Sequence, residues 1–140
     1  MESIRLTYAV AGGDLTMAGE ASSQVKQTLR KLALDADTIR RVSVCMYEGE
    51  INMVIHANGG SADLIVNPDS VDIILADTGP GIPNVELAMK EGYSTAPDNI
   101  RSLGFGAGMG LPNMKRYSDE MHIDTEVGRG TTVTMRVSVK

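Results

Sequence analysis

Residues 77–82 read Asp77-Thr78-Gly79-Pro80-Gly81-Ile82 and follow directly on an apolar run that ends at Ala76. One carboxylate therefore stands beside two glycines at the end of an expected strand. Glycine has no Cβ and tolerates positive φ, so main-chain N–H groups in such a turn can point toward a ligand. The stretch favours a binding site that is built largely from backbone.

A second glycine-rich run, Gly104-Phe105-Gly106-Ala107-Gly108-Met109-Gly110-Leu111, leads into a helix expected over residues 111–119. The first turn of a helix offers unpaired N–H groups and a positive dipole end, and Pro112 suits that first turn. The spacing matches neither a Walker A loop, which needs Gly-Lys-Ser/Thr, nor a dinucleotide fingerprint. We expect Gly104, Gly106, Gly108 and Gly110, with Leu111, to bind the phosphates of a nucleotide.

The position of Asp77 allows two interpretations. It can be an Asx-turn residue that caps its own loop. Alternatively, its carboxylate accepts a hydrogen bond from the exocyclic amino group of adenine. Guanine carries an acceptor at that position, so a buried carboxylate would be left unpaired and would reject it.

Glu48, Asn52 and His56 are spaced by four residues in an expected helix over residues 38–57, so they share one helical face. A carboxylate next to a carboxamide suits a general base beside a Mg²⁺ ligand, because Mg²⁺ prefers oxygen donors. An exposed polar stripe gives the same spacing, and this alternative stays open. Glu50 points off that face, and we expect it to face water.

The remaining pattern predicts an α+β fold. Residues 4–10, 64–66, 71–75, 122–127 and 131–139 alternate or are apolar as in strands, and helices are expected over residues 15–32, 38–57, 85–91 and 111–119. Alternating strands need one covered face, so we expect a two-layer α/β sandwich with a mostly antiparallel, mixed sheet and helices on one face. The long segment over residues 92–110 is typical of a functional lid.

The composition predicts one soluble domain over residues 1–140, with 42% hydrophobic and 22% charged residues. The net charge of −5 and the lack of a basic run with aromatics argue against a nucleic-acid partner. No apolar stretch suits a membrane span or signal peptide, so we expect a cytoplasmic protein without membrane contact. The single Cys45 is expected in the core.

These pieces occur in a familiar order: Glu48…Asn52…His56, then Asp77-x-Gly79-x-Gly81, then the run from Gly104 to Leu111, and finally Gly130-Thr131. In this order they resemble the GHKL ATPase superfamily and its Bergerat-type ATP-binding fold over the whole chain. Within it the chain is similar to bacterial anti-sigma-factor and stressosome switch serine/threonine kinases. Gly92-Tyr93-Ser94-Thr95, Gly110-Leu111-Pro112-x-x-Lys115-Arg116 and Asp119-Glu120 carry that closer likeness.

The resemblance implies roles for individual residues. Glu48 is implied as the catalytic base and Asn52 as the ligand of Mg²⁺. Asp77 is implied to read adenine in a pocket formed by Gly79 and Gly81, with Ile82 beside them. The phosphate lid is implied for Gly106, Gly108 and Gly110, and Thr131 is implied to support Asp77 through water.

The implied function is an ATP-dependent serine/threonine kinase that phosphorylates a serine on an antagonist protein. Two alternatives remain: a non-catalytic, ATP-dependent anti-sigma binding module, and a detached histidine-kinase ATPase domain. The chain has only His56 and His122, neither on a separate dimerisation helix, which disfavours the last. The expected partners are ATP or ADP and an antagonist or sigma-factor-type protein, and a homodimer is left open.

The chain departs from the switch kinases at two places. Gly49 follows the expected base where a better helix former is expected, at a cost of up to about 1 kcal/mol. The lid carries an extra stretch, Ala96-Pro97-Asp98-Asn99-Ile100-Arg101.

Overall fold

The computed structural model describes residues 3–11, 19–57, 59–82, 84–89 and 110–139. Its strands are β1 (Ile4–Ala11), β2 (Gly59–Val66), β3 (Ser70–Ala76), β4 (Glu120–Glu126) and β5 (Gly130–Ser138). Its helices are α1 (Glu20–Lys31), α2 (Ala36–His56), α3 (Val85–Ala88) and α5 (Gly110–Tyr117).

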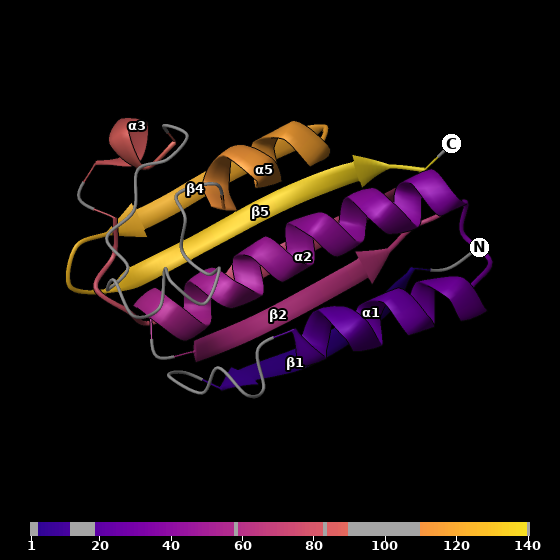
Figure 1. Cartoon of the computed structure of the whole chain (residues 1–140), viewed down its shortest axis with the longest axis horizontal. Helices are drawn as coiled ribbons and strands as arrows, with labels where there is room; N and C mark the ends of the chain where they lie inside the picture. Colours follow the sequence, from indigo (N-terminus) through magenta and orange to yellow (C-terminus); the bar gives the residue numbers. More distant parts are fainter. Residues whose placement is uncertain (1–2, 12–18, 58, 83, 90–109, 140) are drawn as a thin grey trace.

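The five strands form one sheet in the order β1-β2-β3-β5-β4. All four pairings between these described strands are antiparallel, so this part of the sheet is not mixed as expected. The physical reason is the connections. The pairs β2–β3 and β4–β5 are hairpins, whose strands run antiparallel. Between β1 and β2 the chain reverses direction three times, because α1 runs opposite to β1, α2 opposite to α1, and β2 opposite to α2 (Figure 1). As a result β2 is antiparallel to β1.

The helices α1, α2 and α5 lie side by side on one face of the sheet, with α2 in the middle (Figure 1). This confirms the expected two-layer α+β arrangement. The strands alternate as predicted: Val71, Ile73 and Leu75 of β3 are buried under the helices. Burial of such side chains is the main stabilising term, at roughly 25 cal/mol per Å² of apolar surface.

Helix boundaries differ from the expected ones by a few residues. The first helix begins at Glu20, after Gly19 in a left-handed conformation (φ 92°), and the earlier part of the expected helix lies outside the described residues. The second begins at Ala36 because Asp35 caps it, accepting the Thr38 N–H at 3.0 Å. The expected strand over residues 64–66 is longer in the structure, because β2 already begins at Gly59.

Cys45 is a core residue, as expected. It is buried against α5, where its Sγ lies 3.7 Å from the Met114 carbonyl oxygen. Burial raises the pKa of the Cys45 thiol to about 12. In the described part of the chain, no helix combines the length and apolarity that crossing a membrane requires.

Candidate nucleotide site

Asp77 lies immediately after β3 and is held from two sides. Its Oδ1 accepts the N–H of Gly79 at 2.9 Å and the N–H of Thr131 at 3.1 Å. Its own N–H donates to the Thr131 carbonyl at 2.9 Å. The Asx-turn interpretation is thus correct for Oδ1, while Oδ2 has no hydrogen-bond partner among the described residues. The half-buried carboxylate can therefore cap its loop and still accept a hydrogen bond from a ligand.

The glycines around Asp77 are required by close contact. A Cβ on Gly79 would lie 2.6 Å from the Cβ of Ala57, just past the end of α2. A Cβ on Gly81, which has φ +80°, would lie 2.5 Å from the Glu126 carbonyl. The turn therefore packs directly on α2 and on β4, which leaves Asp77 at a fixed place.

Thr131 supports Asp77 through its backbone. Its hydroxyl instead lies 2.8 Å from the hydroxyl of Thr125 in β4. The same Thr125 hydroxyl accepts the N–H of Ile82 at 2.9 Å. Thr125 thus connects the glycine turn to β4 and β5, a role that the sequence pattern did not indicate because threonine is common in strands.

Glu48 and Asn52 lie together on the side of α2 that faces α5. An ideal Cβ on Gly110, the first residue of α5, would meet the side-chain amide of Asn52 at 3.0–3.1 Å. Glu48 accepts a hydrogen bond from the side chain of Asn113, one turn farther along α5. The shared face predicted for Glu48 and Asn52 is confirmed, and it is half-buried rather than a solvent-exposed polar stripe.

Burial raises the pKa of the Glu48 carboxyl, and the hydrogen bond from Asn113 opposes part of that rise. A raised carboxyl pKa makes the carboxylate a stronger base, which suits general-base catalysis. Asn113 is a further candidate site residue. Its position on the face of α5 toward α2 could be found only after the packing of the two helices was known.

The start of α5 is held in place by contacts farther along. Arg41 on α2 donates to the Tyr117 carbonyl at 3.2 Å and pairs with Asp119 at 2.8 Å. Asp119 also accepts the N–H of Ser138 at 2.7 Å, and these contacts lower the pKa of its carboxyl. Because α5 is fixed to both α2 and β5, Gly110 and Asn113 are held beside Asn52 and Glu48.

The glycine turn that carries Asp77 and the pair Glu48–Asn52 lie at different points along α2. Gly79 packs on Ala57 at the end of α2, and nine residues separate Ala57 from Glu48, about 13 Å along the helix axis. The order is therefore Asp77, then Asn52, then Glu48. A nucleotide can lie along this line with its base at Asp77 and its phosphates at Asn52. Gly104, Gly106 and Gly108 lie outside the described residues, and His56 is the last residue of α2.

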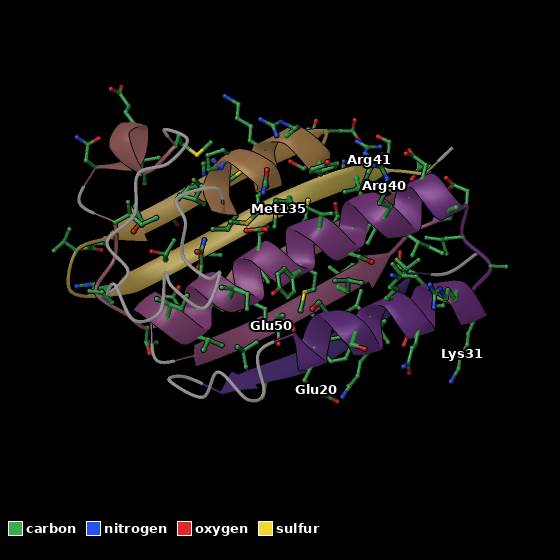
Figure 2. The ribbon with its side chains drawn as sticks, in the orientation of Figure 1. Glu20, Lys31, Arg40, Arg41, Glu50 and Met135 are labelled. Carbon is green, nitrogen blue, oxygen red and sulfur yellow. The ribbon has the colours of Figure 1, made fainter. Side chains whose placement is uncertain are left out.

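The expectation that Glu50 faces water is wrong. Glu50 is 2% exposed, and its carboxylate accepts three N–H groups at the start of α1: Gly19 and Ala21 at 3.1 Å and Ser22 at 3.0 Å. Figure 2 shows Glu50 on the side of α2 that faces α1. The physical reason is that α1 has no side-chain cap of its own, so its free N–H groups need an acceptor. Glu50 lies four residues after Met46 and three before Met53, in register with the buried stripe of α2, a signal that could have revealed it.

The comparison with protein families gives a direct match. The sequence profile of the histidine kinase-like ATPase domain matches residues 13–137. The chain belongs to this family. The resemblance to the GHKL ATPases is confirmed.

Individual relatives indicate which branch of the family this chain resembles. The chain is 35% identical to the anti-sigma F factor of Clostridium beijerinckii over 106 residues, which are 71% of each chain. It is 31% identical to the serine/threonine-protein kinase RsbT of Bacillus subtilis over 97 residues, 66% of this chain and 67% of that protein. This histidine kinase-like ATPase thus groups with ATP-binding anti-sigma factors and switch kinases.

Solved structures agree on the fold. The RsbU and RsbW domains of a Mycobacterium tuberculosis protein superpose with a TM-score of 0.63 at 14% identity, over 99% of this chain and 33% of that one. The mycobacterial sensor histidine kinase MprB superposes with a TM-score of 0.54 at 15% identity, over 98% and 99%. Both likenesses concern the fold.

Proposed function

We propose that residues 1–140 form one ATP-binding domain that acts as a serine/threonine kinase, phosphorylating a serine on an antagonist-type protein partner. The observation that carries the proposal is the placement of Glu48 and Asn52 against the start of α5, with Asp77 at the far end of the same helix. The relatives named anti-sigma F factor and serine/threonine-protein kinase support it.

In this proposal the partner's serine hydroxyl attacks the γ-phosphorus of ATP. The new O–P bond forms as the bond from that phosphorus to the bridging oxygen of ADP breaks, and the serine proton passes to the Glu48 carboxylate. The half-buried position of Glu48 and its raised pKa suit proton acceptance. Asn113 orients Glu48 through its hydrogen bond.

The residues present fit a magnesium ion. Among the described residues no three His, Cys, Asp or Glu side chains form a cluster that could hold a metal. Mg²⁺ is commonly held by one or two protein oxygens, with phosphates and water completing its shell. The Asn52 side chain can supply such an oxygen beside Gly110. When bound, Mg²⁺ neutralises phosphate charge during transfer.

Asp77 would select adenine through Oδ2, the carboxylate oxygen that has no hydrogen-bond partner among the residues that the structure describes. We expect ATP to bind more tightly than GTP by roughly 2–4 kcal/mol, because guanine would leave the carboxylate without a donor. Asp77→Asn should remove most of this preference and weaken ATP binding, as measured by calorimetry. Thr78→Ala, at the exposed neighbouring position, is the control. Equal affinity of the unmodified protein for ATP and GTP would contradict the assignment of Asp77.

The kinase proposal is tested by incubating the protein with γ-labelled ATP and a purified antagonist-type protein. Label should appear on the antagonist and be lost when its acceptor serine is changed to alanine. ATP-dependent binding without transfer would instead show a sequestering module.

We place the protein in the cytoplasm, because ATP and a reducing environment, which suits a single free cysteine, occur there together.

A further inference from the structure

A groove of about 520 Å³ lies between α1 and α2 on the outer side of the helical layer. It begins at Glu48 and Tyr47 and continues past Ser43 toward the start of α2. Three cations border it: Lys26 and Arg30 from α1 and Arg40 from α2. Figure 2 shows Arg40 toward the start of α2, well away from Glu50. The groove therefore joins the candidate base to a positively charged surface.

α1 contributes two of these cations to the groove, and one of them, Arg30, lies in the last turn of α1, where the helix dipole favours a positive charge. Lys26 and Arg30 are four residues apart on one helical face, and like charges at this spacing destabilise a helix by roughly 0.2–0.5 kcal/mol. Neither has an ion pair with any residue that the structure describes. Arg40 has an exposed pair with Asp37 at 3.4 Å, and its guanidinium lies 5.6 Å from the centroid of the Tyr117 ring. Exposed pairs of this kind contribute little, so Arg40 can also bind a ligand.

An aromatic side chain in the groove is also suited to a partner. Tyr47 is 40% exposed, although a large aromatic side chain is usually more covered. The side chains of a bound peptide can pack on this exposed ring.

We propose that this groove binds an acidic segment of the protein partner and so guides the partner's serine to Glu48. The inference rests on the proposed kinase function. Glu48 and Arg40 are eight residues apart on α2, about 12 Å along the axis. An extended chain covers that distance in about four residues. The acidic residues should therefore lie about four residues from the serine.

A peptide fits the groove better than a nucleic acid does. A nucleic acid carries a phosphate at every residue, and the phosphates that approach Glu48 would be repelled. An acidic peptide instead presents a neutral serine at Glu48 and its carboxylates at Lys26, Arg30 and Arg40. The three cations here also form a smaller positively charged surface than proteins that bind nucleic acids normally have.

The test uses dye-labelled synthetic peptides with one serine and an aspartate cluster about four residues from it on either side, compared with asparagine versions. Binding is measured by fluorescence anisotropy in the presence of ATP. We expect the better of the two acidic peptides to bind about fivefold more tightly than its asparagine version, and Arg30→Glu to remove this difference. Lys31→Glu is the matched control, because it makes the same charge change on the next residue of α1, outside the groove.

Equal binding of the acidic and asparagine peptides would overturn the proposal that the groove binds an acidic segment. Equal weakening of acidic-peptide binding by Arg30→Glu and Lys31→Glu would overturn it too. So would a single-stranded oligonucleotide that binds more tightly than the acidic peptide and depends on Arg30 in the same way. Phosphate transfer to the peptides is measured separately. Suppose that Arg30→Glu loses peptide binding but the unmodified protein transfers no phosphate to the peptide. The first result would support peptide binding in the groove, and the second would count against the kinase function. The two proposals can therefore fail independently.

Discussion

Glu48 and Glu50 are two residues apart on the same helix but have opposite surroundings. Glu48 is half-buried and faces α5, where Asn113 is its hydrogen-bond partner. Glu50 is fully enclosed and accepts three backbone N–H groups from the start of α1. A separation of two residues turns a side chain by about 200° around a helix, so the two carboxylates point to opposite neighbours.

The difference shows how one helix can serve both the site and the fold. Glu50 gives α1 the cap that its own sequence lacks, and in doing so it fixes the rotation of α2. That rotation places Glu48 and Asn52 toward α5. A buried carboxylate that accepts three backbone N–H groups is suited to structure, while one with a raised pKa and a single side-chain partner is suited to proton transfer.

The largest effect should come from Glu48→Gln. If Glu48 is the base, phosphate transfer to the partner should fall by about 10²–10⁴-fold, the usual contribution of a general base. ATP affinity and the midpoint of urea unfolding should stay close to those of the unmodified protein. The measurement is the initial rate of label transfer from ATP to the antagonist. An unchanged transfer rate would show that Glu48 is not the base. The two glutamates would then differ only in their surroundings and not in catalytic role.

Glu50→Gln should act on stability instead. The amide keeps one acceptor oxygen but places an NH₂ group against backbone N–H donors, so we expect the free energy of unfolding to fall by about 1–3 kcal/mol. Urea unfolding followed by circular dichroism measures this change. Glu20→Gln is the control, because Glu20 is an exposed carboxylate in the first turn of α1, the helix that Glu50 caps, and should contribute less than about 1 kcal/mol. Similar losses for both variants would mean that Glu50 acts only through the helix dipole.

Much of this comparison could be predicted from the sequence. The spacing of Glu48 and Asn52 gave their shared face, because helical period is a local property. The alternation of Val71, Ile73 and Leu75 gave a strand for the same reason. The burial of Glu50 was missed because it depends on α1, whose capping need appears only when Gly19 is found at its N-cap without a side-chain bond.

The contacts that fix the candidate site depend on even more distant parts of the chain. Asp77 is bonded to Thr131, 54 residues away. Glu48 meets Asn113 only because α5 packs on α2, and Arg41 holds that packing through Asp119. Local patterns indicate which residues are suited to chemistry. Which of them meet is decided by packing between elements that are far apart in sequence.

The smallest effect should come from Gly49→Ala, at the residue between the two carboxylates. Gly49 is buried, and a Cβ there would overlap a methyl group of Leu75 in β3. The close approach of α2 to the sheet explains the glycine, which helix propensity alone disfavours.

Alanine at position 49 would gain about 1 kcal/mol of helix propensity but cost about 1–3 kcal/mol through overpacking. We expect a net loss of about 1 kcal/mol in the free energy of unfolding. Gly49→Ala combined with Leu75→Ala, compared with Leu75→Ala alone, is the control, because space is then available and the propensity gain should appear. A gain from Gly49→Ala alone would mean that Leu75 moves aside freely, and that the close approach of α2 to β3 does not require a glycine at this position.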